Sequence, residues 1–397
     1  MTSDPSKTNG AGNEASGNRH YVDPTPFTPQ RDVILTAEQE RYYQASQWKI
    51  MWWKFLRHKP AVWSAVILLL FYLCVPFAEV IAPYTVHSRD NMHLYAPPQG
   101  IHLFHDGKFV GPFVYGSVAE LDMEEMRWRF RIDSNDVQPL RFFCKGTPYR
   151  FWGLFEARFH LVCPANGGTL YLLGTDRLGR DQFSGLVYGA RLSLTVGLIG
   201  VAISILLGLV LGGIAGYFGG LTDSLIQRLI EIMRSLPELP LWMALSAALP
   251  VTWSPVWIYF GITVILGLLD WPGLARAVRS KFLSLREEEY ATAAELMGAS
   301  PGRIIRRHLM PGFASHIIAS ATLSIPSMIL GETALSFLNL GLKRPSVSWG
   351  VMLNEAQNIT VVTIYPWLMA PVIPIVIVVL AFNFLGDGLR DAADPYK

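Results

Sequence analysis

Few side chains in this 397-residue chain are spaced for chemistry. Two histidines and an aspartate lie close together in the stretch HLFHDG, at His102, His105 and Asp106. Closely spaced His and Asp side chains can bind a metal ion, but this stretch lacks the helix that usually frames a zinc site. We therefore favour a plain surface turn and predict no metal site in the chain.

The sequence also offers no means of hydrolysing a nucleotide or activating a nucleophile. No segment matches GxxxxGK[ST], the glycine-rich loop whose backbone amides hold nucleotide phosphates. Serine, histidine and aspartate candidates for a nucleophilic set occur only in scattered loops, as chance provides. We predict that the chain is not an enzyme and holds no cofactor of its own. Energy for any active process must come from another subunit.

One patterned segment does stand out, namely residues 289–312, which read EYATAAELMGASPGRIIRRHLMPG. Residues 285–297 are good helix formers, and Gly298 is a natural helix stop. Ser300 and Pro301 can begin a second helix, which Pro311 ends before the next apolar run. Four side chains share one face of the first helix at 3–4 spacing: Tyr290, Ala293, Ala294 and Met297.

Two short helices with a small-residue face predict a rigid knob that a partner protein can grip. Small side chains let a partner approach the helix backbone closely. Anchored ends would transmit the partner's movement to the flanking segments. The alternative, which periodicity leaves open, is an amphipathic helix lying on the inner leaflet of a membrane.

The elements that must position this knob are membrane spans. The chain is 51% hydrophobic and 16% charged, with 12 Trp, which disfavours a soluble multi-domain protein. A net charge of +2 is too small to indicate a nucleic-acid partner. Six runs are long enough to cross about 30 Å of hydrocarbon. They cover residues 61–83, 192–218, part of 224–249, 256–275, 313–338 and 364–385. Pro237 and Pro240 should kink or break the third.

Positive charge in short loops predicts the sidedness. Seven basic residues lie within 276–307 and four precede the first span, whereas residues 249–255 have none. We expect the first two segments, and both termini, to be cytoplasmic. The predicted division is a disordered tail (1–45), an interfacial helix and first span (46–83), an extracytoplasmic insertion (84–191), a five-span core (192–390) with the knob at 285–311, and a C-terminal tail (391–397).

The insertion is predicted to be folded and to contain β-strands, because short alternating runs such as TLYLLG recur among Gly and Pro. It holds Cys144 and Cys163, whereas Cys74 lies in the first apolar run. Outside the cytoplasm these two cysteines could pair, but their spacing alone does not show it.

Polar and small residues inside the spans are the remaining candidates for function. A charge in hydrocarbon is costly unless it faces a partner or water. Glu332 and Asp270 are therefore candidates for lining a path across the membrane, although for Glu332 we favour a structural hydrogen-bond acceptor between helices. Gly208, Gly212 and Gly216 recur at every fourth position and predict close helix packing. Packing within the chain is favoured over a face for a second subunit, and the two do not exclude each other.

The knob resembles the EAA loop of bacterial ABC-importer permeases, which docks on ATPase subunits. The resemblance rests on Ala293 and Ala294, on Gly298, and on HLMP ten residues later. The segment is most similar to the dipeptide/oligopeptide (Dpp/Opp) family of DppC/OppC type. It departs from the general motif at Thr292, where a Glu is usual, and at His308, where an aliphatic residue is usual. We associate the second departure with peptide permeases.

Further segments resemble the same family in the same order: GTDRLGRDQFSGLVYGARLSL, GYFGGLTD, GETALSFLNLGL, PSVSWGVML and GDGLRDAADP. The resemblance covers about residues 48–397 apart from the insertion. It implies an all-α integral membrane protein with the six-helix type I ABC importer (MetI-like) permease fold and an α+β or β-rich insertion. It also implies coupling to an ATPase through Glu289, Tyr290, Ala293, Ala294, Met297, Gly298, His308 and Pro311.

The implied location is the bacterial inner membrane, and the implied partners are a second permease of DppB/OppB type, two ABC ATPase subunits that bind ATP and Mg, and an extracytoplasmic solute-binding protein. Peptides are the default substrate, although related systems carry opines, oligosaccharides, nickel or glutathione. A receptor or scaffold that senses a ligand through the insertion, without transport, is the alternative.

Overall fold

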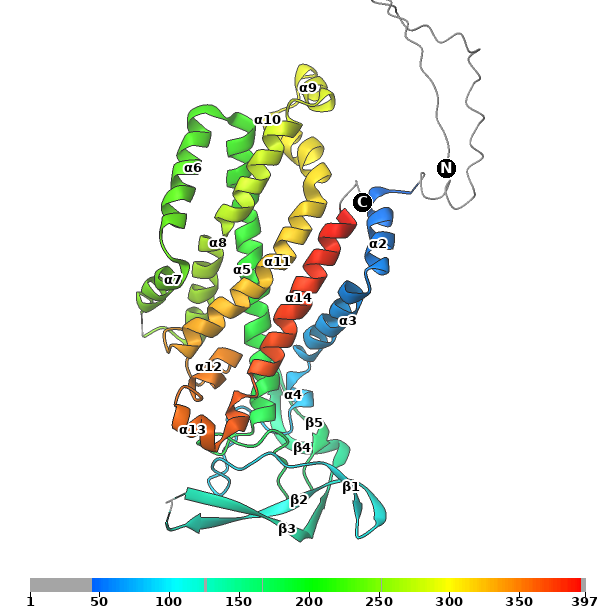
Figure 1. The fold of residues 1–397 in the computed structure, drawn as a ribbon, viewed down its shortest axis with the longest axis vertical. Helices are drawn as coiled ribbons and strands as arrows, with labels where there is room; N and C mark the ends of the chain where they lie inside the picture. The colour runs from blue at the N-terminus through cyan, green and yellow to red at the C-terminus, as the bar shows by residue number, and fades with distance from the viewer. Residues whose placement is uncertain (1–44, 125–126, 166, 251, 394–397) are drawn as a thin grey trace, which may run out of the picture. The chain divides into compact units, whose positions relative to one another are not determined.

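The computed structural model describes residues 45–124, 127–165, 167–250 and 252–393 (Figure 1). Residues from Gln47 onward form one compact unit of long helices with strands at one end. The predicted N-terminal tail lies almost wholly outside the described residues, as do the last four residues of the predicted C-terminal tail.

The predicted interfacial helix and first span form a helical segment that is broken at two places. α2 (Gln47–Arg57) carries the aromatic and basic residues expected at an interface, and α3 (Lys59–Cys74) follows after a bend of 97°. His58 caps α3, and its ring accepts a hydrogen bond from the Ala61 amide. The predicted span of residues 61–83 is not continuous, because the helix stops before Pro76 and resumes as the short α4 (Ala78–Ile81).

The second long helix starts earlier than predicted. α5 runs over Gln182–Phe218, ten residues longer at its N-terminus than the apolar run that begins at residue 192. Asp181 supplies the start signal by accepting hydrogen bonds from the amides of Phe183 and Ser184. Hydropathy marks the apolar part of a helix but not its cap. The insertion therefore ends at residue 181.

The predicted third span is divided in two. Gly219, at φ 65°, ends α5, and α6 (Gly220–Ser235) begins at once, so the expected turn GGLTD shrinks to one residue. α7 (Glu238–Ala247) begins after Pro237, where the break was expected. By length and composition, four helices of the described residues can cross a membrane, or up to five if α2 and α3 count as one span.

The remaining long helices are α8 (Pro255–Leu285), α11 (Met310–Phe337) and α14 (Val372–Ala393). α8 continues ten residues past its predicted end. α14 starts eight residues later than the predicted span and ends at residue 393, eight residues past the predicted span end at 385 and three past the predicted core boundary at 390. The segment before it contains α12 (Trp349–Asn354), α13 (Ile359–Ile364) and a 3-10 turn (Pro366–Met369). Pro366 interrupts the apolar run there, and a hydropathy window does not detect such an interruption.

The glycine ridge of α5 packs against α8 within the chain. A Cβ atom added at Gly212 would lie 2.5 Å from the carbonyl oxygen of Ala275, and one at Gly216 would lie 2.8 Å from that of Arg279. At Gly208 the nearest neighbour would be the Leu274 side chain, at 3.0 Å. The two helix backbones therefore approach too closely for a side chain on this ridge.

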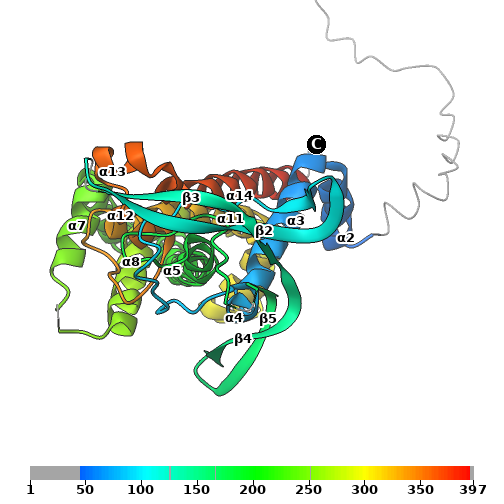
Figure 2. The same ribbon diagram turned by 90° about the horizontal axis from the view of Figure 1, so that it is seen from below.

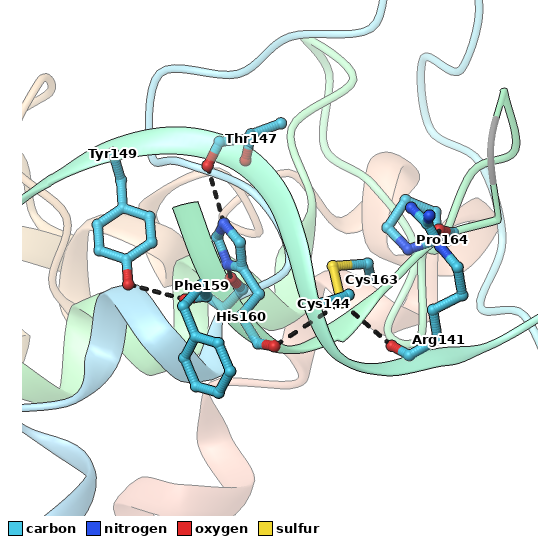
Figure 3. The surroundings of a disulfide bond; sticks show 9 residues. Arg141, Cys144, Thr147, Tyr149, Phe159, His160, Cys163 and Pro164 are labelled. Carbon is cyan, nitrogen blue, oxygen red and sulfur yellow. Dashed lines mark hydrogen bonds between the residues drawn. A yellow bond between two sulfur atoms is a disulfide. The ribbon is translucent and has the colours of Figure 1, made fainter. Parts of the chain in front are cut away.

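The described residues of the insertion form five strands at the end of the bundle opposite α9 (Figures 1 and 2). β1 (His102–His105), β2 (Lys108–Asp122) and β3 (Arg127–Pro139) form an antiparallel sheet. β4 (Arg141–Phe151) and β5 (Phe155–Cys163) form a separate hairpin beside α4. A disulfide joins Cys144 to Cys163 across this hairpin (Figure 3).

The closely spaced His102, His105 and Asp106 lie in β1 and the turn after it. Both histidine rings pack against Phe113 and Tyr115 of β2. Within the described ranges there is no group of three or more His, Cys, Asp and Glu side chains placed to hold a metal ion.

Candidate functional site

The segment between α8 and α11 follows a stalk, by which we mean the C-terminal part of α8 where it is joined to α5 and α6. The C-terminal part of α8 is fixed to the start of α6 by Arg279, which donates two hydrogen bonds to the carboxylate of Asp223. Close to the C-terminus of α8, Arg286 donates to the carbonyl oxygen of Tyr217 at 3.2 Å. Three helices therefore hold the base of this segment together.

The short helix α9 (Glu289–Leu296) follows the stalk after one turn. It stops where predicted, because Gly298 adopts a left-handed conformation at φ 81° that other residues rarely adopt. The helix is shorter than the predicted 285–297, because residues 286–288 form a turn between α8 and α9.

One face of α9 is buried against its own chain. Ala291 and Ala294 pack against Phe282 of α8 and against Ile304 and Leu309 after α9. The methyl side chains let the helix lie close to these larger residues. Ala294 therefore belongs to the intramolecular contact, which corrects the prediction that it shares an outer face with Tyr290, Ala293 and Met297.

The opposite face of α9 is exposed and, apart from Glu289 at its start, apolar. Leu296 and Met297 are 85% and 81% exposed, and Tyr290 is 44% exposed. Ala293 is exposed between them. Partial burial and the nearby Glu288 raise the pKa of the Tyr290 phenol, which keeps it a neutral donor. This surface, defined by Tyr290, Ala293, Leu296 and Met297, is called the α9 face below.

Leu296 was missed in the sequence, although a signal was present. It lies three residues after Ala293 and next to Met297, so helical spacing alone places it on the same side. Two large apolar side chains at one exposed helix end are unusual on a surface without a partner.

The second predicted helix is not separate from the fifth apolar run. α10 (Pro301–Arg303) continues through a π-helical segment (Ile304–Leu309) into α11. The Met310 amide bonds to the Ile305 carbonyl, five residues back. This spacing fits Pro311, whose ring would clash with the carbonyl four residues back in a regular α-helix. Pro311 therefore does not end a helix, and Ser300 precedes α10 without a side-chain capping bond.

A basic groove lies beside α9. It encloses about 850 Å³ and is lined by Ser300, Gly302, Arg303, Arg306, Arg307 and Pro311. Pro311 and the arginines are exposed, whereas His308 is half-buried. Three guanidinium groups on one exposed groove favour contact with an acidic surface.

Glu332 is fully buried where α5, α11 and α12 meet. Its carboxylate accepts hydrogen bonds from the hydroxyls of Ser336 and Ser348, both at 2.7 Å, and of Ser193 at 3.3 Å. Each serine oxygen also accepts a backbone amide hydrogen. The hydroxyl hydrogens are thus left to point at Glu332. This geometry fits the favoured interpretation of Glu332 as a structural hydrogen-bond acceptor between helices.

Asp270 has a different environment. It is half-buried on α8 and accepts a hydrogen bond from Ser204 of α5 at 2.9 Å. It also lines a cavity of about 220 Å³ at the break between α6 and α7, together with Arg234, Glu238 and Trp242. The structure therefore separates Asp270 from Glu332, and only Asp270 borders open space.

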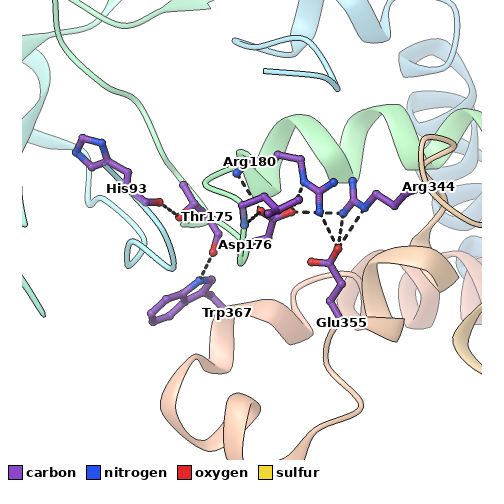
Figure 4. Close-up of polar contacts among 8 residues, drawn as sticks. His93, Thr175, Asp176, Arg180, Arg344, Glu355 and Trp367 are labelled. Atoms are coloured by element: carbon purple, nitrogen blue, oxygen red, sulfur yellow. Dashed lines mark hydrogen bonds and ion pairs between the residues drawn. The ribbon is translucent and has the colours of Figure 1, made fainter. Parts of the chain in front are cut away.

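A buried ionic cluster lies at the other end of the bundle (Figure 4). Arg180 donates to Asp176 at 2.6 Å and to Glu355 at 2.8 Å, and Arg344 lies 3.1 Å from Glu355. The cluster ties the chain before α5 to the chain between α11 and α13. Asp176 and Arg180 can be seen in the sequence within GTDRLGRD. Their partner Glu355 lies 175 residues after Arg180, and the sequence does not show that the two meet.

Two family models match the chain. The model described as "Binding-protein-dependent transport system inner membrane component" matches residues 208–396. The model described as "N-terminal TM domain of oligopeptide transport permease C" matches residues 46–98. The first match contains the whole segment from α8 to α11, and the second contains α2 to α4.

Curated relatives agree with these matches. The dipeptide transport system permease protein DppC of Alkalihalophilus pseudofirmus is 42% identical over 223 residues, which is 56% of this chain and 71% of that one. The oligopeptide transport system permease protein OppC of Bacillus subtilis is 36% identical, over 56% and 70% of the two chains. OppC of Haemophilus influenzae is 38% identical, over 57% and 70%.

Among solved structures, an inward-facing form of the MetNI methionine ABC transporter has a chain that is 20% identical to this one. The match covers 52% of this chain and 95% of that one, with a TM-score of 0.41.

Proposed function

This chain belongs to the DppC/OppC family of binding-protein-dependent permeases, and from that premise we propose that it is the inner-membrane permease subunit of an ATP-driven peptide importer. The peptide class is supported by the names of the relatives, which are dipeptide and oligopeptide permeases. Family membership supports this function over a receptor or scaffold without transport.

The α9 face is the observation that carries the proposed mechanism. We infer that it inserts into a groove of an ABC ATPase subunit, with the basic groove beside it meeting acidic residues of that subunit. Leu296 and Met297 supply the apolar anchors, since removing apolar surface from water is the main favourable term in most protein–protein association. The predicted set Glu289, Tyr290, Ala293, Met297, Gly298, His308 and Pro311 stays in this proposal, joined by Leu296, while Ala294 holds α9 to its own chain.

The force of the ATPases would travel along two continuous helices. Nucleotide-driven closure moves α9, and α9 packs on the ends of both α8 and α11. α8 in turn moves with α5, because the glycine ridge leaves no space for sliding. Movement at α9 therefore becomes rotation of α5, α8 and α11 as a group.

The complete assembly is proposed to contain two permeases, two ATPases that bind ATP and Mg, and a solute-binding protein on the insertion's side. In this arrangement α6 and α7 together form the third of six spans, and both termini lie in the cytoplasm. Asp270, beside the break between α6 and α7, is the residue we place on the translocation path. Broken helices border substrate sites in many transporters.

The test replaces the two anchors of the α9 face by aspartate, in Leu296→Asp and Met297→Asp, within the complete transporter. Both variants should insert normally, fail to copurify with the ATPase subunits and lose uptake of a labelled dipeptide. Met123→Asp is the matched control, because Met123 is 72% exposed at the other end of the molecule. Normal ATPase recovery with both α9 variants would refute the proposed docking.

A further inference from the structure

The turn of the β4–β5 hairpin presents apolar side chains that are largely exposed. Leu154 is 77% exposed, and Phe155 and Trp152 are 57% and 48% exposed. We call these three residues the hairpin tip. Phe77, in the break between α3 and α4, is half exposed as well. Exposed clusters of this kind mark contact with a protein or with lipid.

The hairpin tip is fixed to the ends of two apolar helices. The Trp152 indole N–H donates to the carbonyl oxygen of Pro76 at 3.1 Å, and its backbone amide donates to Glu79 at 3.4 Å. The guanidinium of Arg191 lies 4.1 Å from the centre of the Trp152 ring. Arg191 also pairs with Glu79 at 2.6 Å. The height of the tip relative to α3 and α5 is thus set by the structure.

The hairpin is oriented with its turn toward the helices' apolar parts. Nδ1 of His160, midway along β5, lies 2.7 Å from the carbonyl oxygen of Ala82 (Figure 3 shows His160 within the hairpin). Trp152, at the turn, contacts Pro76, six residues earlier in the outgoing chain. The chain from Pro76 to Ala82 leads away from α3, so the hairpin runs back along it. The turn is therefore the part of the hairpin nearest to α3.

The positions of the charged residues along α3 and α5 indicate the depth of the tip relative to the membrane. α3 has no charged residue between Lys59 and its end at Cys74, and α5 has none after Arg191. Pro76 and Arg191 therefore lie where the apolar parts of their helices end, which is the boundary of the hydrocarbon on the insertion's side. Trp152 contacts both residues. Trp and Tyr are enriched at this boundary because each ring has an apolar body and a polar group, which in Trp is the indole N–H.

We propose that the hairpin tip enters the bilayer interface, with Leu154 and Phe155 among the lipid headgroups and upper acyl chains and with Trp152 as the interfacial anchor. Its occupant is a lipid surface, because the tie to α3 and α5 sets its depth at the membrane boundary. The exposed Arg150 and Glu156 flank the turn as a cross-strand pair and stay in the headgroup layer. The proposal requires that α3 and α5 cross the membrane, not that the chain transports peptides.

The test uses the full chain in lipid nanodiscs with a spin label at Leu154→Cys or at Phe155→Cys. Cys74→Ser removes the free thiol and leaves the disulfide in place. Accessibility of the label to oxygen, which dissolves in lipid, is compared with accessibility to a water-soluble nickel chelate. Met123→Cys is the control, because this residue is 72% exposed, between Leu154 and Phe155 in exposure, but lies beyond the end of β2.

We expect the ratio of oxygen to nickel accessibility to be several-fold higher at both tip positions than at Met123→Cys. Equal, water-like ratios at all three positions would overturn the proposal. Labels that are mobile in nanodiscs but immobilised by the solute-binding protein or by the second permease would also overturn it, because a protein would then cover the tip. Two tip positions are tested so that misfolding of one variant leaves the other to decide.

Discussion

The two ends of this molecule are held by different interactions. At the α9 end, small residues pack against larger ones, and the ion pair between Arg279 and Asp223 joins α8 to α6. At the insertion end, a disulfide, the Arg191–Glu79 pair and the four-residue ionic cluster combine. The contacts named at the insertion end are directional, whereas α9 itself is held by apolar packing that leaves its other side exposed.

This difference matches what each end has to do in the proposed importer. An end that is moved by a partner needs a rigid internal joint and an open docking face, and the α9 segment has both. An end that holds position during that movement needs contacts that resist sliding, and hydrogen-bonded ion pairs provide them. We therefore expect that substitutions at one end change the function of that end and leave the other end intact.

The largest effect is expected at Gly298. Gly298→Arg places a long charged side chain at a left-handed position beside the α9 face, and we expect uptake and ATPase association to be abolished while membrane insertion stays intact. Gly298→Ala carries the backbone strain without the bulk or charge, which costs about 1 kcal/mol, and should keep much of the association. Uptake assays and copurification of both variants measure the effect. Normal uptake by Gly298→Arg would show that the α9 end does not couple transport to an ATPase.

The second effect concerns the disulfide. Replacing both Cys144 and Cys163 by serine frees a loop with a sequence separation of 19, which should destabilise the hairpin by about 3 kcal/mol. Limited proteolysis within residues 141–163 should become faster, while ATPase copurification stays at the wild-type level. Loss of ATPase association in this variant would show that the two ends are not independent.

The third effect tests the buried carboxylate between the two ends. Glu332→Gln turns an acceptor of three serine hydroxyls into a group with an amide donor facing them, which should cost about 1–3 kcal/mol. The thermal midpoint of the purified protein should fall, and the apparent KM for dipeptide uptake should not change. A changed KM at an unchanged midpoint would return Glu332 to the translocation path.

Sequence reasoning recovered this architecture where local chemistry decides it. The break at Pro237, the stop at Gly298 and the glycine ridge on α5 each follow from one residue type at one position. It failed at helix starts such as Gln182, because an apolar window does not detect a capping aspartate. It also failed at Pro311, where a π-helical segment absorbs the proline.

The site was predicted in part for the same reasons. Helical spacing located the α9 segment but assigned Ala294 to the wrong face, since alanine suits both a buried and an exposed position. The partners of Glu332 and of Arg180 are distant in sequence, and only the folded chain brings them together. Resemblance to a family supplied the function, and the structure supplied which side of α9 remains open.

The smallest effect is expected at the base of the stalk, where Arg279 and Asp223 join α8 to α6. Both groups are partly exposed, so Asp223→Asn should cost only about 1 kcal/mol in unfolding free energy. Asn keeps the size of the side chain and one acceptor oxygen, which isolates the charge. ATPase copurification should be unchanged, because the α9 face is intact. Uptake per ATP hydrolysed should nevertheless fall, since a looser stalk transmits less of the movement from α9 to α5. An unchanged ratio would mean that packing by the glycine ridge alone is enough to transmit the movement. The α9 end would then depend on shape and not on charge.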